Sequence, residues 1–263
     1  MTFITPTRLR EMKRTGEKIA CLTAYDASFA ALLDEAGVEV LLVGDSLGMV
    51  IQGHQSTLEV RLNDMIYHTA NVRRGRKRAL ILSDLPFMSY STPVQALGSA
   101  GRVMQSGAQM VKLEGGAWLA ETVRLLDARG IPVCAHLGLM PQSIHKLGGY
   151  RVQARSSEEA ERLLEEARIL EQAGAALLVV ECIPWALAAT VSQKLDIPVI
   201  GIGAGSGCDG QVLVLYDMLG LAAKIPSFCR NFACSHNDVR SALRDYVHAV
   251  KTGEFPGTEH GFD

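Results

Sequence analysis

One stretch of the sequence indicates the kind of fold, Met110-Val111-Lys112-Leu113-Glu114-Gly115-Gly116. Short apolar runs bounded by glycine are typical of buried strands. In a strand, Lys112 and Glu114 lie on the same face, about 6.6 Å apart. A buried lysine and glutamate are costly unless they are paired, hydrated or bound to a metal ion. The stretch therefore predicts a buried strand that ends either in a structural ion pair or in a functional site.

Apolar runs of this kind recur along the chain and alternate with segments of helical periodicity. Strands are expected over residues 19–24, 38–43, 79–82, 110–114, 132–135, 176–180 and 198–202, with an ambiguous last one within 210–221. Helices are expected over residues 7–18, 27–36, 62–74, 93–106, 118–129, 156–172, 185–194 and 237–252. Such alternation implies parallel strands joined by right-handed crossovers. With about eight strands, a (β/α)8 TIM barrel is favoured over an open doubly wound sheet.

The sequence also predicts the number of domains, the irregular loops and one helix start. No linker or shift in composition divides the chain, so residues 1–263 are expected to form one barrel domain. Segments 47–59 and 141–155 lack a clear period and are predicted to be irregular loops. Ser156 and Glu159 have the spacing of a capping box at the start of a helix.

Composition narrows the class of protein. Hydrophobic residues make up 48% of the 263 residues, enough for a large core. The net charge of −2 gives no electrostatic reason to expect nucleic acid or an anionic membrane as a partner. Six cysteines without a C-x-x-C pair indicate a reducing, cytoplasmic environment. We expect neither a signal peptide nor a membrane helix, because the first residues are charged and no apolar run approaches ~18 residues.

Five successive predicted strands end in an ionisable side chain: Asp45, Asp84, Glu114, His136 and Glu181. The carboxyl ends of barrel strands are where active sites lie. Each of these residues alone could be a helix cap, but the series predicts a functional site. Four carboxylates near one lysine and one histidine repel one another unless a cation is bound. Oxygen ligands favour Mg²⁺ or Mn²⁺ over zinc, and His136 is expected to hydrogen-bond the substrate.

Several motifs resemble those of the ketopantoate hydroxymethyltransferase family, a member of the phosphoenolpyruvate/pyruvate barrel superfamily. The match is collinear and covers nearly the whole chain. It is carried by Thr23-Ala24-Tyr25-Asp26, Val43-Gly44-Asp45-Ser46-Leu47-Gly48, Gln52-Gly53-His54, Asp84-Leu85-Pro86-Phe87, Val111-Lys112-Leu113-Glu114-Gly115-Gly116, His136-Leu137-Gly138-Leu139, Gly148-Gly149-Tyr150, Glu181-Cys182-Ile183-Pro184 and Gly201-Ile202-Gly203-Ala204-Gly205.

The resemblance implies an enzyme of pantothenate biosynthesis. Such an enzyme transfers a hydroxymethyl group from 5,10-methylenetetrahydrofolate to 3-methyl-2-oxobutanoate, through a Mg²⁺-stabilised enolate, to give 2-dehydropantoate (ketopantoate). The resemblance also implies one Mg²⁺ per subunit and a homo-oligomer, which is decameric in bacterial members. The folate contacts are what it fixes least.

Carried over by motif, the resemblance assigns roles to individual residues. It implies Mg²⁺ ligands at Asp45, Asp84 and Glu114. It implies contacts to the oxoacid at Asp45, Ser46, Asp84 and Lys112, to which His136 is added as a hydrogen-bond partner. Glu181 would be the base that removes the C3 proton.

Two alternatives remain open at this stage. The first is another Mg²⁺-dependent 2-oxoacid lyase or mutase of the same superfamily, which would need an acid or nucleophile, often a cysteine, on a mobile loop. Segment 47–59 contains no cysteine. The second is a non-catalytic barrel that binds a metal ion or a folate. Turnover with the oxoacid, a one-carbon donor and Mg²⁺ would separate the three.

Overall fold

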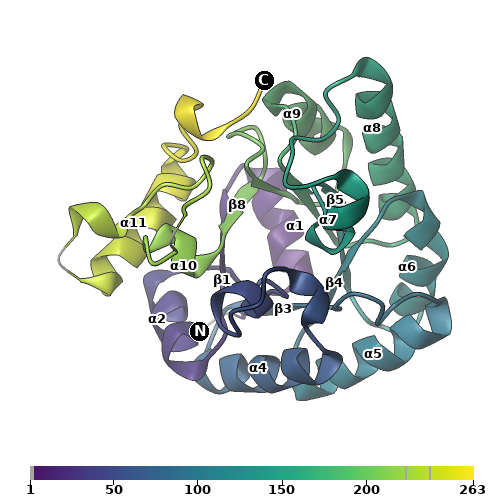
Figure 1. Ribbon diagram of the computed structural model, residues 1–263, viewed down its shortest axis with the longest axis horizontal. Helices are drawn as coiled ribbons and strands as arrows, with labels where there is room; N and C mark the ends of the chain where they lie inside the picture. Colours follow the sequence, from purple (N-terminus) through teal and green to yellow (C-terminus); the bar gives the residue numbers. More distant parts are fainter. Residues whose placement is uncertain (1–2, 223, 237) are drawn as a thin grey trace.

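The computed structural model describes residues 3–222, 224–236 and 238–263, and at its centre is a closed barrel of parallel strands (Figure 1). Neighbours around the barrel follow the order of the sequence, and β8 closes it by pairing with β1. The strands are β1 Ile19–Thr23, β2 Val40–Val43, β3 Leu80–Asp84, β4 Met110–Glu114, β5 Val133–Gly138, β6 Leu177–Glu181, β7 Val199–Ile202 and β8 Gly210–Leu213. The predicted (β/α)8 TIM barrel is confirmed.

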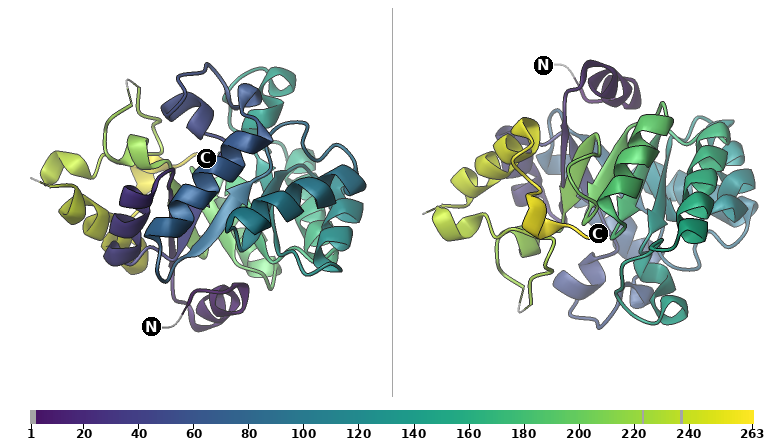
Figure 2. Two further views of the ribbon diagram at one scale, coloured as in Figure 1. Left: turned by 90° about the horizontal axis from the view of Figure 1, so that it is seen from below. Right: turned by 90° about the horizontal axis from the view of Figure 1, so that it is seen from above.

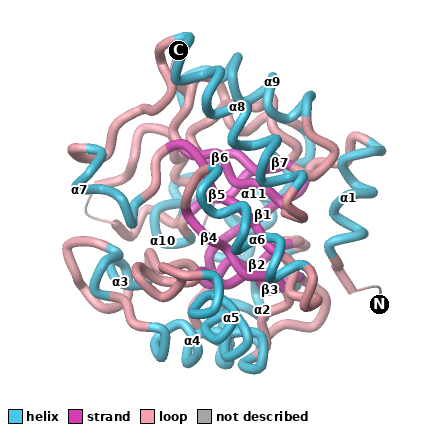
Figure 3. The backbone as a smooth tube through the Cα atoms, turned by 90° about the vertical axis from the view of Figure 1, so that its right-hand side faces the viewer, coloured by secondary structure: helices cyan, strands magenta, loops and turns pink. Residues whose placement is uncertain are grey.

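Helices surround the strands on all sides, as the tube view shows (Figure 3). They are α1 Pro6–Thr15, α2 Ala27–Ala36, α3 Leu47–Val50, α4 Leu62–Gly75, α5 Pro93–Ser106, α6 Ala120–Asp127, α7 Ile144–Leu147, α8 Ser157–Gln172, α9 Trp185–Lys194, α10 Leu215–Met218 and α11 Val239–Thr252. Short 3₁₀ turns follow several strands, among them η1 Thr57–Glu59 and η3 Pro141–Ser143. Within the described part of the chain, none of these helices combines the length and apolar character needed to cross a membrane.

Local sequence signals set the helix ends. Thr92 caps α5 by accepting a hydrogen bond from the backbone N of Gln95, and Pro93 occupies the first helical turn. Gly37 ends α2 in the left-handed conformation, at φ 101°, which a residue with a Cβ adopts only at a cost. The capping box predicted for Ser156 and Glu159 is present at the start of α8.

Helix α1 covers the end of the barrel where the strands begin, and the cavity lies at the other end. Helix α1, the dark purple helix beside the N label in Figure 2, lies across the end where the strands begin. Its Leu9 and Met12 pack with the inward-facing strand residues, such as Ile19 and Leu80. Lys13 Nζ holds the helix there through Asp209 Oδ2 at 2.8 Å. The cavity lies at the opposite end of the barrel, at the carboxyl ends of the strands.

The structure differs from the sequence prediction mainly in the loops. Segments 47–59 and 141–155 contain α3, η1, η3 and α7, which are too short for an apolar period to show. The ambiguous segment 210–221 splits into β8 and α10. The helix expected over 237–252 is α11, and Asn237 lies outside the described residues.

Candidate active site

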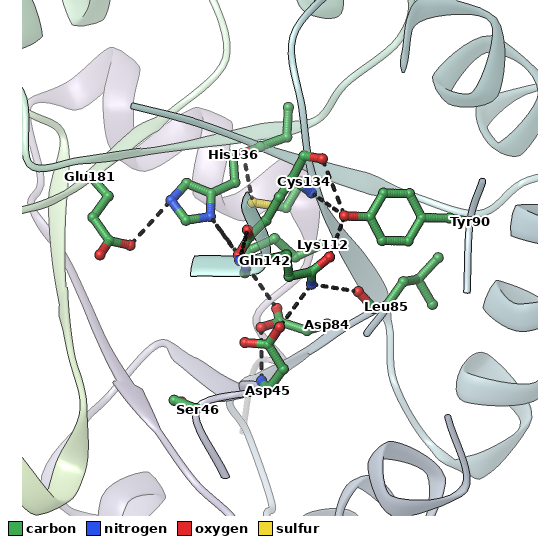
Figure 4. Close-up of polar contacts among 12 residues, drawn as sticks. Asp45, Ser46, Asp84, Leu85, Tyr90, Lys112, Cys134, His136, Gln142 and Glu181 are labelled. Atoms are coloured by element: carbon green, nitrogen blue, oxygen red, sulfur yellow. Dashed lines mark hydrogen bonds and ion pairs between the residues drawn. The ribbon is translucent and has the colours of Figure 1, made fainter. Parts of the chain in front are cut away.

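A cavity of about 610 Å³ opens at the carboxyl ends of the strands. All the site residues predicted from the sequence line it: Asp45, Ser46, Asp84, Lys112, Glu114, His136 and Glu181. They stand at or just after the ends of β2 to β6, and Figure 4 shows how most of them lie relative to one another. Because parallel strands all end at the same rim, residues far apart in the sequence meet here.

Lys112 pairs with two carboxylates. Its Nζ lies 3.2 Å from Asp84 Oδ1, across the register of β3 and β4, and 3.5 Å from Glu114 Oε1 on its own strand. Burial by itself would lower the pKa of Lys112, but attraction to Asp84 and Glu114 raises it well above its usual value. The simple Lys–Glu pair considered from the sequence is therefore part of a larger cluster, in which Lys112 is a permanent cation.

The neighbouring groups stabilise the charged forms of the site carboxylates to different extents. Burial, followed by repulsion from Asp84 and Glu114, raises the pKa of Asp45 well above its usual value. Burial would also raise the pKa of Glu114, but Lys112 and His136 outweigh this and lower it. Asp45 is therefore the acid of the cluster that the protein alone stabilises least in its charged form.

His136 lies between two carboxylates. Its Nδ1 is 3.4 Å from Glu114 Oε1, and its Nε2 is 3.2 Å from Glu181 Oε2. Burial and the nearby Lys112 oppose the charged ring, yet the contacts with Glu114 and Glu181 raise the pKa of His136 to about 9. In its protonated form, His136 forms an ion pair with Glu181, a contact that the sequence did not indicate.

Gln142 and Tyr90 were missed by the sequence analysis. The side-chain Nε2 of Gln142 donates to Asp45 Oδ2 at 2.8 Å and to the carbonyl of Leu85 at 3.0 Å. Its backbone N donates to Glu114 Oε2 at 2.9 Å. The hydroxyl of Tyr90 donates to Gln142 Oε1 and accepts from the backbone N of Glu114. Gln142 thus connects the ends of three strands.

Ser46 and Cys182 flank the acids. The hydroxyl of Ser46 lies 2.9 Å from that of Tyr25, which holds it at the cavity edge. Cys182, directly after Glu181, has φ 46°, a left-handed conformation that is uncommon for a residue with a side chain. Its backbone N and O bond to Ile202 and Gln153, so the strained position is fixed from both sides.

The donor set suits a hard divalent cation. Asp45, Asp84 and Glu114 are each no more than 4% exposed, and Asp84 Oδ1 is buried without accepting a hydrogen bond from the described residues. As the side chains stand, no three acidic, histidine or cysteine residues of the described part form a complete metal-binding group. Mg²⁺ is commonly held by one or two carboxylates and completed by water or substrate oxygens, so an incomplete protein set fits this ion.

Several curated proteins that are similar to this chain carry the same enzyme name. The family model described as ketopantoate hydroxymethyltransferase matches residues 4–258. The 3-methyl-2-oxobutanoate hydroxymethyltransferase 2 of Pseudomonas entomophila (strain L48) is 59% identical over 100% of this chain and 99% of its own length. The 3-methyl-2-oxobutanoate hydroxymethyltransferase of Nitrosococcus oceani is 61% identical over 97% and 98%.

Solved structures show a more distant likeness. A phosphonopyruvate hydrolase, solved in complex with oxalate and Mg²⁺, has a TM-score of 0.62 at 11% identity, over 96% of this chain and 99% of its own. At such low identity the likeness shows a shared barrel fold alone.

Proposed function

Because the chain belongs to the ketopantoate hydroxymethyltransferase family, and is thereby a one-carbon transferase, we propose that it converts 3-methyl-2-oxobutanoate to 2-dehydropantoate with 5,10-methylenetetrahydrofolate as the one-carbon donor. The observation that carries this proposal is the full-length match at 59% identity to a relative that bears the enzyme's name. The chemistry of the cavity supports it, as the following steps describe.

Asp45, Asp84 and Glu114 would hold Mg²⁺ in this proposal, and Lys112 and Ser46 would bind the oxoacid beside it. Bound Mg²⁺ supplies a Lewis acid that polarises the 2-oxo group and stabilises an enolate. Lys112 Nζ, a buried permanent cation, offers a partner to the substrate carboxylate. A phosphonopyruvate hydrolase of the same fold was solved with Mg²⁺ and oxalate, so a barrel of this shape can take such a pair, an analogy of fold alone.

Glu181 is the proposed base. Its side chain is 13% exposed, the most open of the acids in the cluster, and it faces the cavity. His136 Nε2 lies 3.2 Å from Glu181 Oε2 on the protein side, and the other oxygen, which accepts no hydrogen bond from the described residues, would take the C3 proton. The electron pair left on C3 then forms the bond to the methylene carbon of the folate. Water supplies the hydroxyl oxygen as the carbon–nitrogen bonds break, and tetrahydrofolate leaves.

The lyase or mutase alternative is less well supported. Lyases, mutases and hydrolases among the solved structures resemble this chain only in fold, at 11–18% identity. The η1 and α3 segment over the cavity, residues 47–59, contains no cysteine to act as an acid. By resemblance we further propose a cytoplasmic homodecamer. Exposed apolar residues outside the cavity, such as Val94 and Trp118, offer surface for such contacts.

Proton exchange without folate tests the proposal. In D₂O with Mg²⁺ and 3-methyl-2-oxobutanoate, the enzyme should exchange the C3 proton, seen by NMR as loss of the C3–H signal and collapse of the methyl doublet. Glu181→Gln keeps the shape but cannot take the proton, so exchange should fall at least ~10²-fold. Glu165→Gln, on the exposed face of α8, is the matched control and should exchange like wild type. Equal exchange by Glu181→Gln would make another group the base.

A further inference from the structure

The cavity has a second wall that the oxoacid site does not use. It is built by residues at and after the ends of β7 and β8 and by residue 262, and most of its side chains are apolar: Ile202, Val212, Val214, Pro226, Phe228 and Phe262. Its polar members are Asp217, Lys224 and Ser227. A volume of about 610 Å³ exceeds the need of a branched five-carbon oxoacid, and cavities of this size commonly hold a drug-sized ligand. A larger ligand with apolar faces therefore has room beside the strand-end acids.

Phe228 is fixed within this wall by a close backbone contact. Gly203, at the end of β7, has φ 59°, and a Cβ at that position would lie 3.0 Å from the Phe228 ring. Glycine thus allows the ring to pack directly on the strand end. A fixed aromatic side chain in a cavity wall is suited to contact a flat ring system.

Asp217 is the one carboxylate on this side of the cavity among the described lining residues. It lies in α10, whose start has no side-chain cap, so the carboxylate is not engaged in capping its helix. No hydrogen bond or ion pair to its side chain occurs among the described residues. Burial raises the pKa of Asp217 to about 6. A partly dehydrated carboxylate without partners is unfavourable, and N–H donors from a ligand would relieve it.

We propose that Asp217 binds the pterin ring of the folate cosubstrate, while the apolar wall around Phe228 covers the faces of that ring. This inference rests on the proposed function. The pterin edge carries two adjacent donors, the ring N3–H and the 2-amino group, which match the two oxygens of a carboxylate as a guanidinium does. Binding there keeps the folate on the β7–β8 side of the cavity and leaves the acids of β2 to β6 to the oxoacid.

Direct binding tests the inference on the full chain. Titration calorimetry with 5-formyltetrahydrofolate should give a Kd at least about 10-fold higher for Asp217→Asn than for wild type, because the variant replaces one acceptor by a donor. The 2-desamino analogue should bind wild type more weakly than the parent folate, but should bind Asp217→Asn about as well as the parent. Such coupling identifies a direct contact rather than a structural effect. Asp196→Asn, an exposed aspartate outside the cavity, is the matched control.

The exchange reaction separates the two proposals. C3 proton exchange needs no folate, so a wild type that binds folate through Asp217 but does not exchange would overturn the oxoacid chemistry and support the pterin subsite. A wild type that exchanges normally, but whose Asp217→Asn variant binds 5-formyltetrahydrofolate within twofold of it, would overturn the pterin subsite alone. Absence of any folate binding by wild type would also overturn the pterin subsite.

Discussion

Gln142 is an uncharged side chain among the site carboxylates, and its orientation is determined by its neighbours. Its Oε1 must face the Tyr90 hydroxyl, a donor, and its Nε2 must face Asp45 Oδ2 and the Leu85 carbonyl, which are acceptors. Its backbone N simultaneously fixes Glu114 Oε2. One oxygen of each of these two acids is therefore held by Gln142, which sets the direction in which the other oxygen points.

Loss of the Gln142 side chain should weaken metal binding. Among the described residues, Gln142 is the one side-chain hydrogen-bond donor to Asp45, and Gln142→Ala removes it. Loss of a residue that orients a metal ligand, the role proposed for Asp45, typically costs 10–100-fold in affinity. We expect a fall of about that size in Mn²⁺ affinity, measured by electron paramagnetic resonance without substrate. Gln172→Ala, at the exposed end of α8, should bind Mn²⁺ like wild type. Unchanged affinity in Gln142→Ala would show that Asp45 needs no such support.

The type of side chain determines which site residues could be predicted from the sequence. Asp84, Lys112 and Glu114 could be predicted because charged residues at the ends of apolar runs are costly to bury and so point to a function. Gln142 and Tyr90 could not, because an amide and a phenol in a loop are ordinary surface residues by sequence. Their roles depend on contacts across 24 to 97 residues of chain, which no local pattern contains.

At the scale of elements, end signals determined how well each one could be predicted. Helix α5, Pro93–Ser106, was predicted with its observed ends because Pro93 and Gly107 mark them, and the structure adds Thr92 as the cap. Helices α3 and α7 have four residues each, less than the span over which apolar periodicity can be recognised. Met49 of α3 lines the cavity, as do Pro141 and Tyr150 on either side of α7, so the least predictable elements belong to the site's surroundings.

The capping box of α8 gives a test at this scale. Ser156 accepts a hydrogen bond from the backbone N of Glu159, whose side chain in turn accepts one from the backbone N of Ser156. Ser156→Ala removes the first bond and should lower the free energy of unfolding by about 1 kcal/mol, measured by urea denaturation. The neighbouring Ser157→Ala keeps the cap and should change stability by less than about 0.5 kcal/mol. Equal effects of the two changes would mean that the cap contributes nothing specific.

At the scale of the whole molecule, the packed apolar core and the charged site lie at opposite ends of the barrel. Helix α1 and the apolar interior close one end, where Leu9 and Met12 are fully buried. The other end gathers Asp45, Asp84, Glu114 and Glu181, and among the described residues the cations that form ion pairs with these acids are Lys112 and His136. In the metal-free protein the charged forms of these acids are therefore costly, that of Asp45 above all, and the packing of the rest of the molecule must offset this cost.

The cost of charging Asp45 predicts that Asp45→Asn is more stable than wild type without a metal ion and less stable than wild type with Mg²⁺. Asp45 is 4% exposed, and no lysine, arginine or histidine of the described residues forms an ion pair with it. Asparagine keeps an acceptor for Gln142 Nε2 while removing a charge that Asp84 and Glu114 repel. In EDTA the variant should melt above wild type, and a gain of about 1 kcal/mol corresponds to about 2–4 °C for a domain of roughly this size.

With Mg²⁺ the order should change, because only wild type keeps all three proposed ligands. At a free Mg²⁺ concentration of 100 times its Kd, wild type should gain about 2.7 kcal/mol, whereas Asp45→Asn should gain little at the same concentration. Scanning calorimetry of both proteins in EDTA and in Mg²⁺ measures all four values, and the exposed Asp196→Asn should follow wild type in each condition. An Asp45→Asn protein that melts below wild type in EDTA would contradict the prediction, because it would show that the charge of Asp45 stabilises the barrel even without a metal ion.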